Sequence, residues 1–74
     1  MDKLKFYQKL AAILDVEEVK AENVLADFES WDSLSALSIL ALADSEYGVT
    51  LRAEELRSAV TAEDLANLLE SKRK

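Results

Sequence analysis

The longest apolar helical run of the chain starts at Asp32 or Ser33 and extends to Tyr47, and residues that start and stop helices bound it on both sides. Asp and Ser, which stand at positions 32 and 33, are both good N-cap residues. Gly48 is the single glycine of the chain, and it follows the stretch where a helix end favours a left-handed residue. The stretch therefore predicts a helix with both ends marked, whose apolar face the rest of the chain has to cover.

A helical wheel of about 100° per residue divides this predicted helix into two unlike faces. The face expected to point inward carries Ala36, Ile39, Leu40, Ala43 and Tyr47. The opposite face carries Leu34, Ser38, Ala41 and Ser45, and the boundary is formed by Leu37 and Leu42. The outward face is thus small and weakly apolar rather than charged.

Similar patterns predict three further helices. Residues 2 to 15 place apolar side chains on one helical face, at Phe6, Leu10, Ile13 and Leu14. A short helix is expected over roughly residues 53 to 58, with Leu56 pointing inward. The last helix starts at Thr61, which forms a capping-box pattern with Asp64, and its apolar stripe is Leu65, Leu68 and Leu69. Because no segment shows strand alternation, the sequence predicts an all-α four-helix bundle with three longer helices and one short helix.

The segment from Val16 to Trp31 continues no full helix pattern and is expected to form a long first loop. A helical turn is expected around Glu17 to Ala21. A loop of this length in a small domain is usually functional or pinned by anchors. The candidate anchors into the core are Val24 and Phe28.

Composition limits both the size of the protein and its chemistry. The 74 residues are enough for one domain, residues 1–74, and they include no Cys and no His. Disulfides, thiolate metal sites and imidazole catalysis are therefore excluded. No apolar run is long enough to span a membrane, and no signal-peptide pattern is present at Met1, so the expected location is the cytoplasm.

The net charge of −6 is unevenly distributed, because positions 15 to 64 hold thirteen acids and three bases. An acidic middle repels nucleic acid and anionic membranes and favours basic protein partners. The alternative interpretation is that this charge only keeps a small domain soluble.

The sequence offers no catalytic residues and no strong metal site. The adjacent carboxylate pairs, such as Glu54 and Glu55, point about 100° apart on a helix and cannot act as an acid/base dyad. No base lies near Ser33 to activate it as a nucleophile. A cation held by Asp27, Glu29 and Asp32 would bind weakly, since their spacing is not that of a calcium loop. We therefore do not expect an enzyme.

Ser33 remains as an acceptor of a covalent group that a partner enzyme attaches. A phosphodiester at a helix N-terminus meets backbone amides and a favourable dipole. The alternative is that Asp32 or Ser33 serves only as an N-cap.

The residues 30 to 34, Ser-Trp-Asp-Ser-Leu, and 47 to 51, Tyr-Gly-Val-Thr-Leu, resemble those of acyl carrier proteins, as do the length, acidity, helix order and long first loop. The resemblance implies the fold of that family and a 4'-phosphopantetheine arm on Ser33. It further implies that a phosphopantetheinyl transferase takes the arm from coenzyme A and that the arm's thiol carries acyl groups as thioesters. Loading by an acyl- or aminoacyl-ligase and delivery to downstream biosynthetic enzymes follow from the same resemblance.

Two departures from the family pattern point to a specialised biosynthetic pathway rather than to fatty-acid synthesis. Ser35 and Ser38 stand where fatty-acid carriers commonly have acids, and Trp31 replaces a small residue. With fewer charges on that helix, docking is expected to depend more on apolar contacts. The expected partner-recognition residues are Asp32, Leu34, Leu37, Ser38 and Ala41.

Several alternatives stay open within this interpretation. Trp31 is also interpreted as a loop anchor that packs on the bundle. The small residues Ala36 and Ala43 leave room for a cargo chain, unless Leu40 and Tyr47 fill it. The cargo is either an acyl group or an aminoacyl group, as in peptidyl carriers. The alternative from a different functional class is an unmodified helical adaptor that only binds other proteins. A monomer is expected because the outward apolar face is small.

Overall fold

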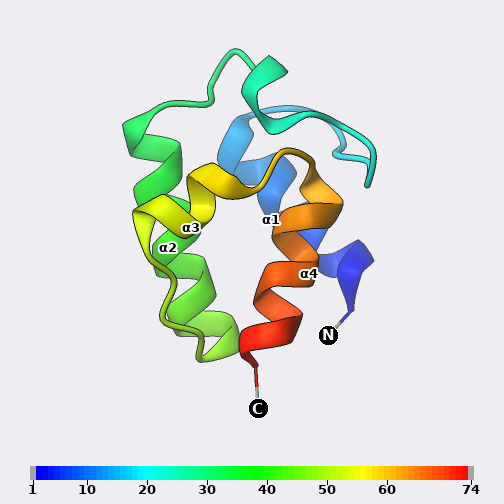
Figure 1. The fold of residues 1–74 in the computed structure, drawn as a ribbon. Helices are drawn as coiled ribbons and strands as arrows, with labels where there is room; N and C mark the ends of the chain where they lie inside the picture. The colour runs from blue at the N-terminus through cyan, green and yellow to red at the C-terminus, as the bar shows by residue number, and fades with distance from the viewer. Residues whose placement is uncertain (1, 74) are drawn as a thin grey trace.

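A computed structural model describes residues 2–73 and contains four α-helices within that range. They are α1 (Lys3–Leu14), α2 (Ser33–Tyr47), α3 (Ala53–Ser58) and α4 (Ala62–Lys72). Helix α1 packs against α2 and α4, and α3 packs against α2. Figure 1 shows the long connection between α1 and α2 crossing one end of the bundle, while both termini lie toward the other end. The prediction of an all-α bundle with one short helix is confirmed.

The helix ends follow the capping signals in the sequence. The Asp2 side chain accepts a hydrogen bond from the Lys5 amide and caps α1. Gly48 ends α2 with φ 65°, in the left-handed region where a side chain is disfavoured. Thr61 and Asp64 close the predicted capping box at the start of α4. These local signals therefore determine where the elements of the bundle start and stop.

The helical turn of the first loop lies later than predicted. A single turn of 3-10 helix, η1, spans Leu25–Asp27, and residues 17 to 21 form no helical turn, so the prediction for that segment is wrong. The anchors also differ, because Val19 and Leu25 are buried whereas Val24 remains 36% exposed. Phe28 is half-buried and packs against the core, as expected.

Backbone hydrogen bonds explain why Leu25, rather than Val24, points inward. Val24 pairs with Thr61 as an isolated antiparallel bridge, and the Leu25 amide donates to the Val60 carbonyl at 2.9 Å. Adjacent residues of extended chain point to opposite sides, so pairing at Val24 directs its neighbour into the core. The loop also accepts hydrogen bonds from the first two amides of α4, through the carbonyls of residues 21 and 23.

The core is built mainly from aliphatic residues of α1 and α4, with contributions from the other elements. Its largest fully buried side chains include Phe6, Leu10, Leu14, Ile39, Leu56, Leu65 and Leu69. The rings of Phe6 and Tyr47 meet edge to face, with centroids 5.9 Å apart, and join α1 to the end of α2. Within the described residues, no helix combines the length and apolarity that crossing a membrane requires.

Candidate functional site

Ser33 is the first residue of α2, and its side chain is exposed. Within residues 2–73 its hydroxyl takes part in no hydrogen bond. The hydroxyl is therefore accessible to a reagent or partner and is not needed to hold the helix end.

Asp32 is the residue that caps α2, and Ser35 completes the cap. The Ser35 amide donates to the Asp32 carboxylate, and the Asp32 amide donates to the Ser35 hydroxyl, both at 2.9 Å. The Ser35 hydroxyl in turn donates to the Asp32 carbonyl at 2.9 Å. This reciprocal capping box fixes the start of the helix on both sides of Ser33. In the described part of the chain, the amides of Ser33 and Leu34 have no acceptor, so they remain open to an anion.

The structure changes the interpretation of Ser35. From the family resemblance, Ser35 is interpreted as a serine in place of an acid on the partner-facing side of the helix. Its side chain is, however, only 6% exposed. Its hydroxyl is committed to the capping box, so Ser35 belongs to the interior of the site. Ser38, by contrast, is exposed and remains the neutral residue on the outer face.

The residues predicted to recognise partners come together on one side of α2. Leu34 is 74% exposed and Leu37 is 62% exposed. Ser38 and Ala41 are exposed on the same helix, four residues after Leu34 and Leu37 respectively, and Asp32 is exposed at its start. Leu37, expected at the boundary of the two faces, thus lies on the outer one, whereas Leu42 packs against the core.

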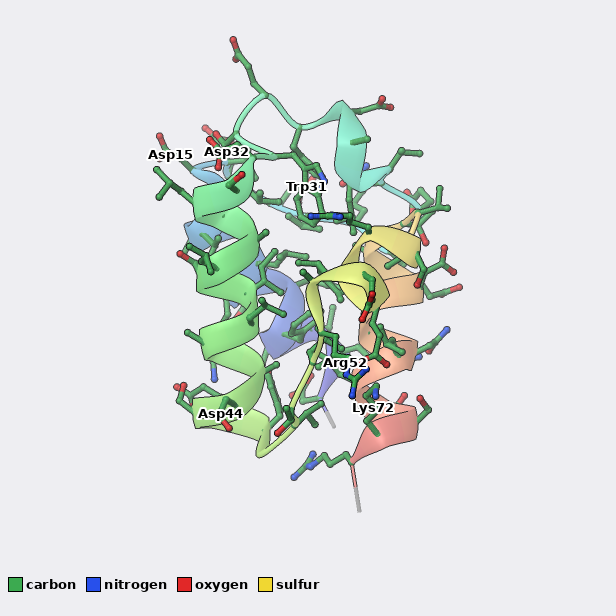
Figure 2. All side chains as sticks on the ribbon, turned by 60° about the vertical axis from the view of Figure 1, so that its left-hand side comes forward. Asp15, Trp31, Asp32, Asp44, Arg52 and Lys72 are labelled. Atoms are coloured by element: carbon green, nitrogen blue, oxygen red, sulfur yellow. The ribbon has the colours of Figure 1, made fainter. Side chains whose placement is uncertain are left out.

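A cavity of about 380 Å³ opens beside Ser33, between α2 and α3. Its apolar walls are formed by Ala36, Leu37, Leu40, Ala53 and Leu56. It is also lined by Trp31, Asp32, Ser33 and Arg57. Figure 2 shows Trp31 at the end of the first loop, close to the start of α2 at Asp32. Trp31 is half-buried and packs against the core, so its role as a loop anchor is confirmed.

The position of the cavity shows which residues of α2 leave space for a cargo chain. Ala36 borders the cavity, whereas Ala43 is fully buried in the core and does not. Leu40 lines the cavity instead of filling it, and Tyr47 packs on Phe6. Arg57, which lines the cavity, was not predicted as a site residue, although a cation between acidic segments of the sequence was a visible signal.

An ion pair holds α3, which forms one wall of the cavity, against α4. The Lys72 ammonium lies 2.6 Å from the Glu55 carboxylate. This hydrogen bond, together with one from the Arg52 amide, lowers the pKa of Glu55 below its ordinary value. Within the described residues no group of three or more acidic side chains is placed to hold a metal ion, and Asp27, Glu29 and Asp32 form no such cluster.

Comparison with known proteins identifies the family of this chain. No protein-family model and no solved structure matches it. The chain is 32% identical over 78 aligned positions to a protein named acyl carrier protein from Petrotoga mobilis, and the alignment covers 97% of this chain and 92% of the relative. Similarity over nearly the whole of both chains agrees with the four-helix order and the capped serine at the start of α2. The chain therefore belongs to the acyl carrier protein family.

Proposed function

We propose that Ser33 is the attachment point of a 4'-phosphopantetheine arm, and that the protein carries acyl intermediates on it as thioesters. Membership of the acyl carrier family supports the carrier role. The observation that carries the assignment to Ser33 is its exposed, unbonded hydroxyl at the first position of a capped helix. A phosphopantetheinyl transferase would supply the arm from coenzyme A.

The residues around Ser33 suit a phosphodiester. The amides of Ser33 and Leu34 have no acceptor in residues 2–73, and the positive end of the α2 dipole favours an anion there. The capping box between Asp32 and Ser35 keeps these amides in place without using the Ser33 hydroxyl. When attached, the arm supplies a thiol, which the chain itself lacks because it contains no cysteine.

We further propose that partner enzymes dock on the outer face of α2. Leu34 and Leu37 give this face two exposed aliphatic side chains within one turn of Ser33. Ser38 and Ala41 extend it without charge, and Asp32 adds one acid at its start. A surface of this composition favours partners with a shallow apolar contact region over partners that rely on a basic patch.

The neutral outer face and Trp31 favour a specialised pathway over fatty-acid synthesis. A ligase or adenylating enzyme would load the cargo, and the cargo is acyl in the first interpretation and aminoacyl in the second. The candidate from a different class is an unmodified helical adaptor, which the excess of acids between positions 15 and 64 would also suit.

The attachment is tested by incubating the purified protein with coenzyme A, Mg²⁺ and a broad-range phosphopantetheinyl transferase. We expect the intact mass to rise by one arm in the wild type and in Ser45→Ala, a control on the exposed face of the same helix. Ser33→Ala should remain unmodified and keep its melting temperature, because the Ser33 hydroxyl makes no hydrogen bond in the described residues. An unchanged wild-type mass, with a known carrier modified alongside, would falsify the assignment.

The adaptor alternative makes the opposite prediction for the same variant. If Ser33→Ala retains full biological activity, the arm is unnecessary and the adaptor interpretation is correct. Loss of activity in a variant that keeps its melting temperature would instead exclude a role limited to unmodified protein binding.

A further inference from the structure

Ser33 and Arg57 line the same cavity from two different helices. Ser33 opens α2, and Arg57 is the second-last residue of α3. The other residues of the cavity are apolar except for Asp32. The carboxylate of Asp32 already accepts the hydrogen bond from the Ser35 amide. Arg57 is thus the only cation among the residues that line the cavity.

Arg57 has no anionic partner within the described part of the chain, although the protein is strongly acidic. Lys3, Lys9, Lys20, Arg52 and Lys72 each lie within 4.0 Å of a carboxylate. Glu54, three residues before Arg57 on α3, approaches Arg52 instead, at 3.9 Å. The remaining acid of α3, Glu55, pairs with Lys72. The guanidinium of this cavity-lining residue is therefore available to an external anion.

We propose that Arg57 binds an anionic oxygen of the group carried on Ser33, and that this anion is the phosphodiester of the arm. The inference rests on the attachment of the arm to Ser33. A phosphodiester on that hydroxyl brings a negative charge to the cavity that Arg57 also lines. Guanidinium and phosphate form charge-assisted, often bidentate hydrogen bonds, which fix direction as well as position. Arg57 is then a positioning residue that turns the arm toward α3 and the cavity.

This pairing would place the arm on one side of α2 and leave the other side for docking of a partner enzyme. An arm directed toward the cavity leaves Leu34, which is 74% exposed and does not line the cavity, open to a partner enzyme. The side chain of Arg57 is exposed, so its attraction to the phosphodiester should weaken as salt is added. A carboxylate at the far end of a cargo could offer the same chemistry, and the experiment separates the two sources.

The test compares the unmodified and modified forms of the wild type, Arg57→Gln and Arg52→Gln. Arg52 is the matched control, since it precedes α3, is exposed and does not line the cavity. Figure 2 shows Arg52 at the opposite end of α3 from the loop that bears Trp31. Intact mass first establishes that each protein is modified. The readouts are the ³¹P resonance of the phosphodiester and the change in melting temperature on modification.

We expect modification to raise the melting temperature of the wild type by about 2 to 4 °C more than that of Arg57→Gln. Arg52→Gln should behave as the wild type does, and the difference should shrink in about 0.5 M NaCl. The ³¹P resonance should move between the wild type and Arg57→Gln but not between the wild type and Arg52→Gln. In Arg57→Glu, modification should lower the melting temperature.

Equal changes in all modified proteins, with one common ³¹P resonance, would overturn the role of Arg57 while leaving the arm on Ser33 intact. A dependence on Arg57 that arises only with a succinyl cargo, and not with the bare arm or an acetyl cargo, would assign the anion to the cargo and overturn the phosphodiester pairing. Absence of any mass change in the wild type would remove the proposed function, and this inference with it.

Discussion

The two sides of the bundle differ in how completely they are packed. Of the side chains on α1 and α4, Phe6, Leu10, Leu65 and Leu69 are entirely buried. Between α2 and α3, residues such as Leu40 border an open cavity and remain half-buried. The candidate site lies on this second side, beside Ser33. Apolar surface is therefore more completely buried on one side of the molecule, and the cavity leaves part of it accessible on the other.

The short helix α3 on the cavity side is held in place by few contacts. A helix of six residues is not stable alone and depends on its tertiary contacts. Here the buried side chain of Leu56 and the ion pair between Glu55 and Lys72 provide those contacts. A wall held at few points suits a cavity that admits a ligand, whereas the α1–α4 contact is built to stay closed.

Truncation in the closed half should have the largest effect on stability. We expect Leu69→Ala to lower the free energy of unfolding by about 3 kcal/mol, because it leaves a void among fully buried side chains. Leu34→Ala, on the exposed face of α2, should change it by less than about 0.5 kcal/mol. Urea unfolding followed by circular dichroism measures both. Equal losses would contradict the division into a closed and an open half.

Replacing an alanine by a larger residue should also affect the two halves differently. Ala66 is fully buried on α4, so Ala66→Leu should cost about 2 kcal/mol through overpacking. Ala36 borders the cavity, and Ala36→Leu has space to enter, so it should stabilise the protein by at most about 1 kcal/mol. The same urea measurement applies. A large loss in Ala36→Leu would show that the cavity does not accept added side chains.

The loss of the cap at the start of α2 should lower the free energy of unfolding by an intermediate amount. Asp32→Ala removes the acceptor of the Ser35 amide and should cost about 1 kcal/mol. Asp32→Asn should retain most of the stability, because asparagine is as good an N-cap as aspartate. Thermal unfolding of the two variants distinguishes a hydrogen-bonding role of Asp32 from one based on its charge. If both variants lose stability equally, the charge is what matters.

Much of the fold could be predicted because its signals are local. The ends of α2 and α4 depend on residues within four positions of each other, as at Thr61 and Asp64 or at Gly48. The inward faces of α1 and α4 follow largely from helical spacing, but the predicted Ile13 and Leu68 are only half-buried. The buried residues that were not predicted are Tyr7, Ala11, Ala62 and Ala66. Because its signal is also local, Ser33 could be identified as a candidate from the residues around it.

The parts that could not be predicted depend on contacts between distant segments. The loop is fixed by backbone hydrogen bonds to residues 60 to 63, and backbone groups leave no signature in the sequence. This pairing is why Leu25, and not Val24, became the anchor. The cavity and the place of Arg57 in it likewise arise only when α3 folds onto α2.

The smallest effect should come from pH acting on the wall of the cavity. The hydrogen bond from Lys72 is the main cause that lowers the pKa of Glu55 below its ordinary value of about 4.5. A lowered carboxyl pKa stabilises the fold above the unfolded-state value, and this contribution is lost as the pH falls through the folded-state value. Lys72→Met should therefore be less stable than the wild type at neutral pH and should approach it as the pH falls through the folded-state pKa of Glu55.

The control for this experiment is Lys20→Met, because Lys20 pairs with Glu18 at 3.6 Å in the exposed first loop and supports no wall. Melting temperatures of the three proteins between pH 7 and about pH 3, with an NMR titration of the Glu55 carboxyl, make the measurement. In Lys72→Met the pKa of Glu55 should rise toward its ordinary value. If the stability of Lys72→Met falls below that of the wild type by the same amount at every pH, Lys72 acts through packing rather than charge. The wall of α3 would then be held as the α1–α4 contact is, and the contrast between the two halves would rest on the cavity alone.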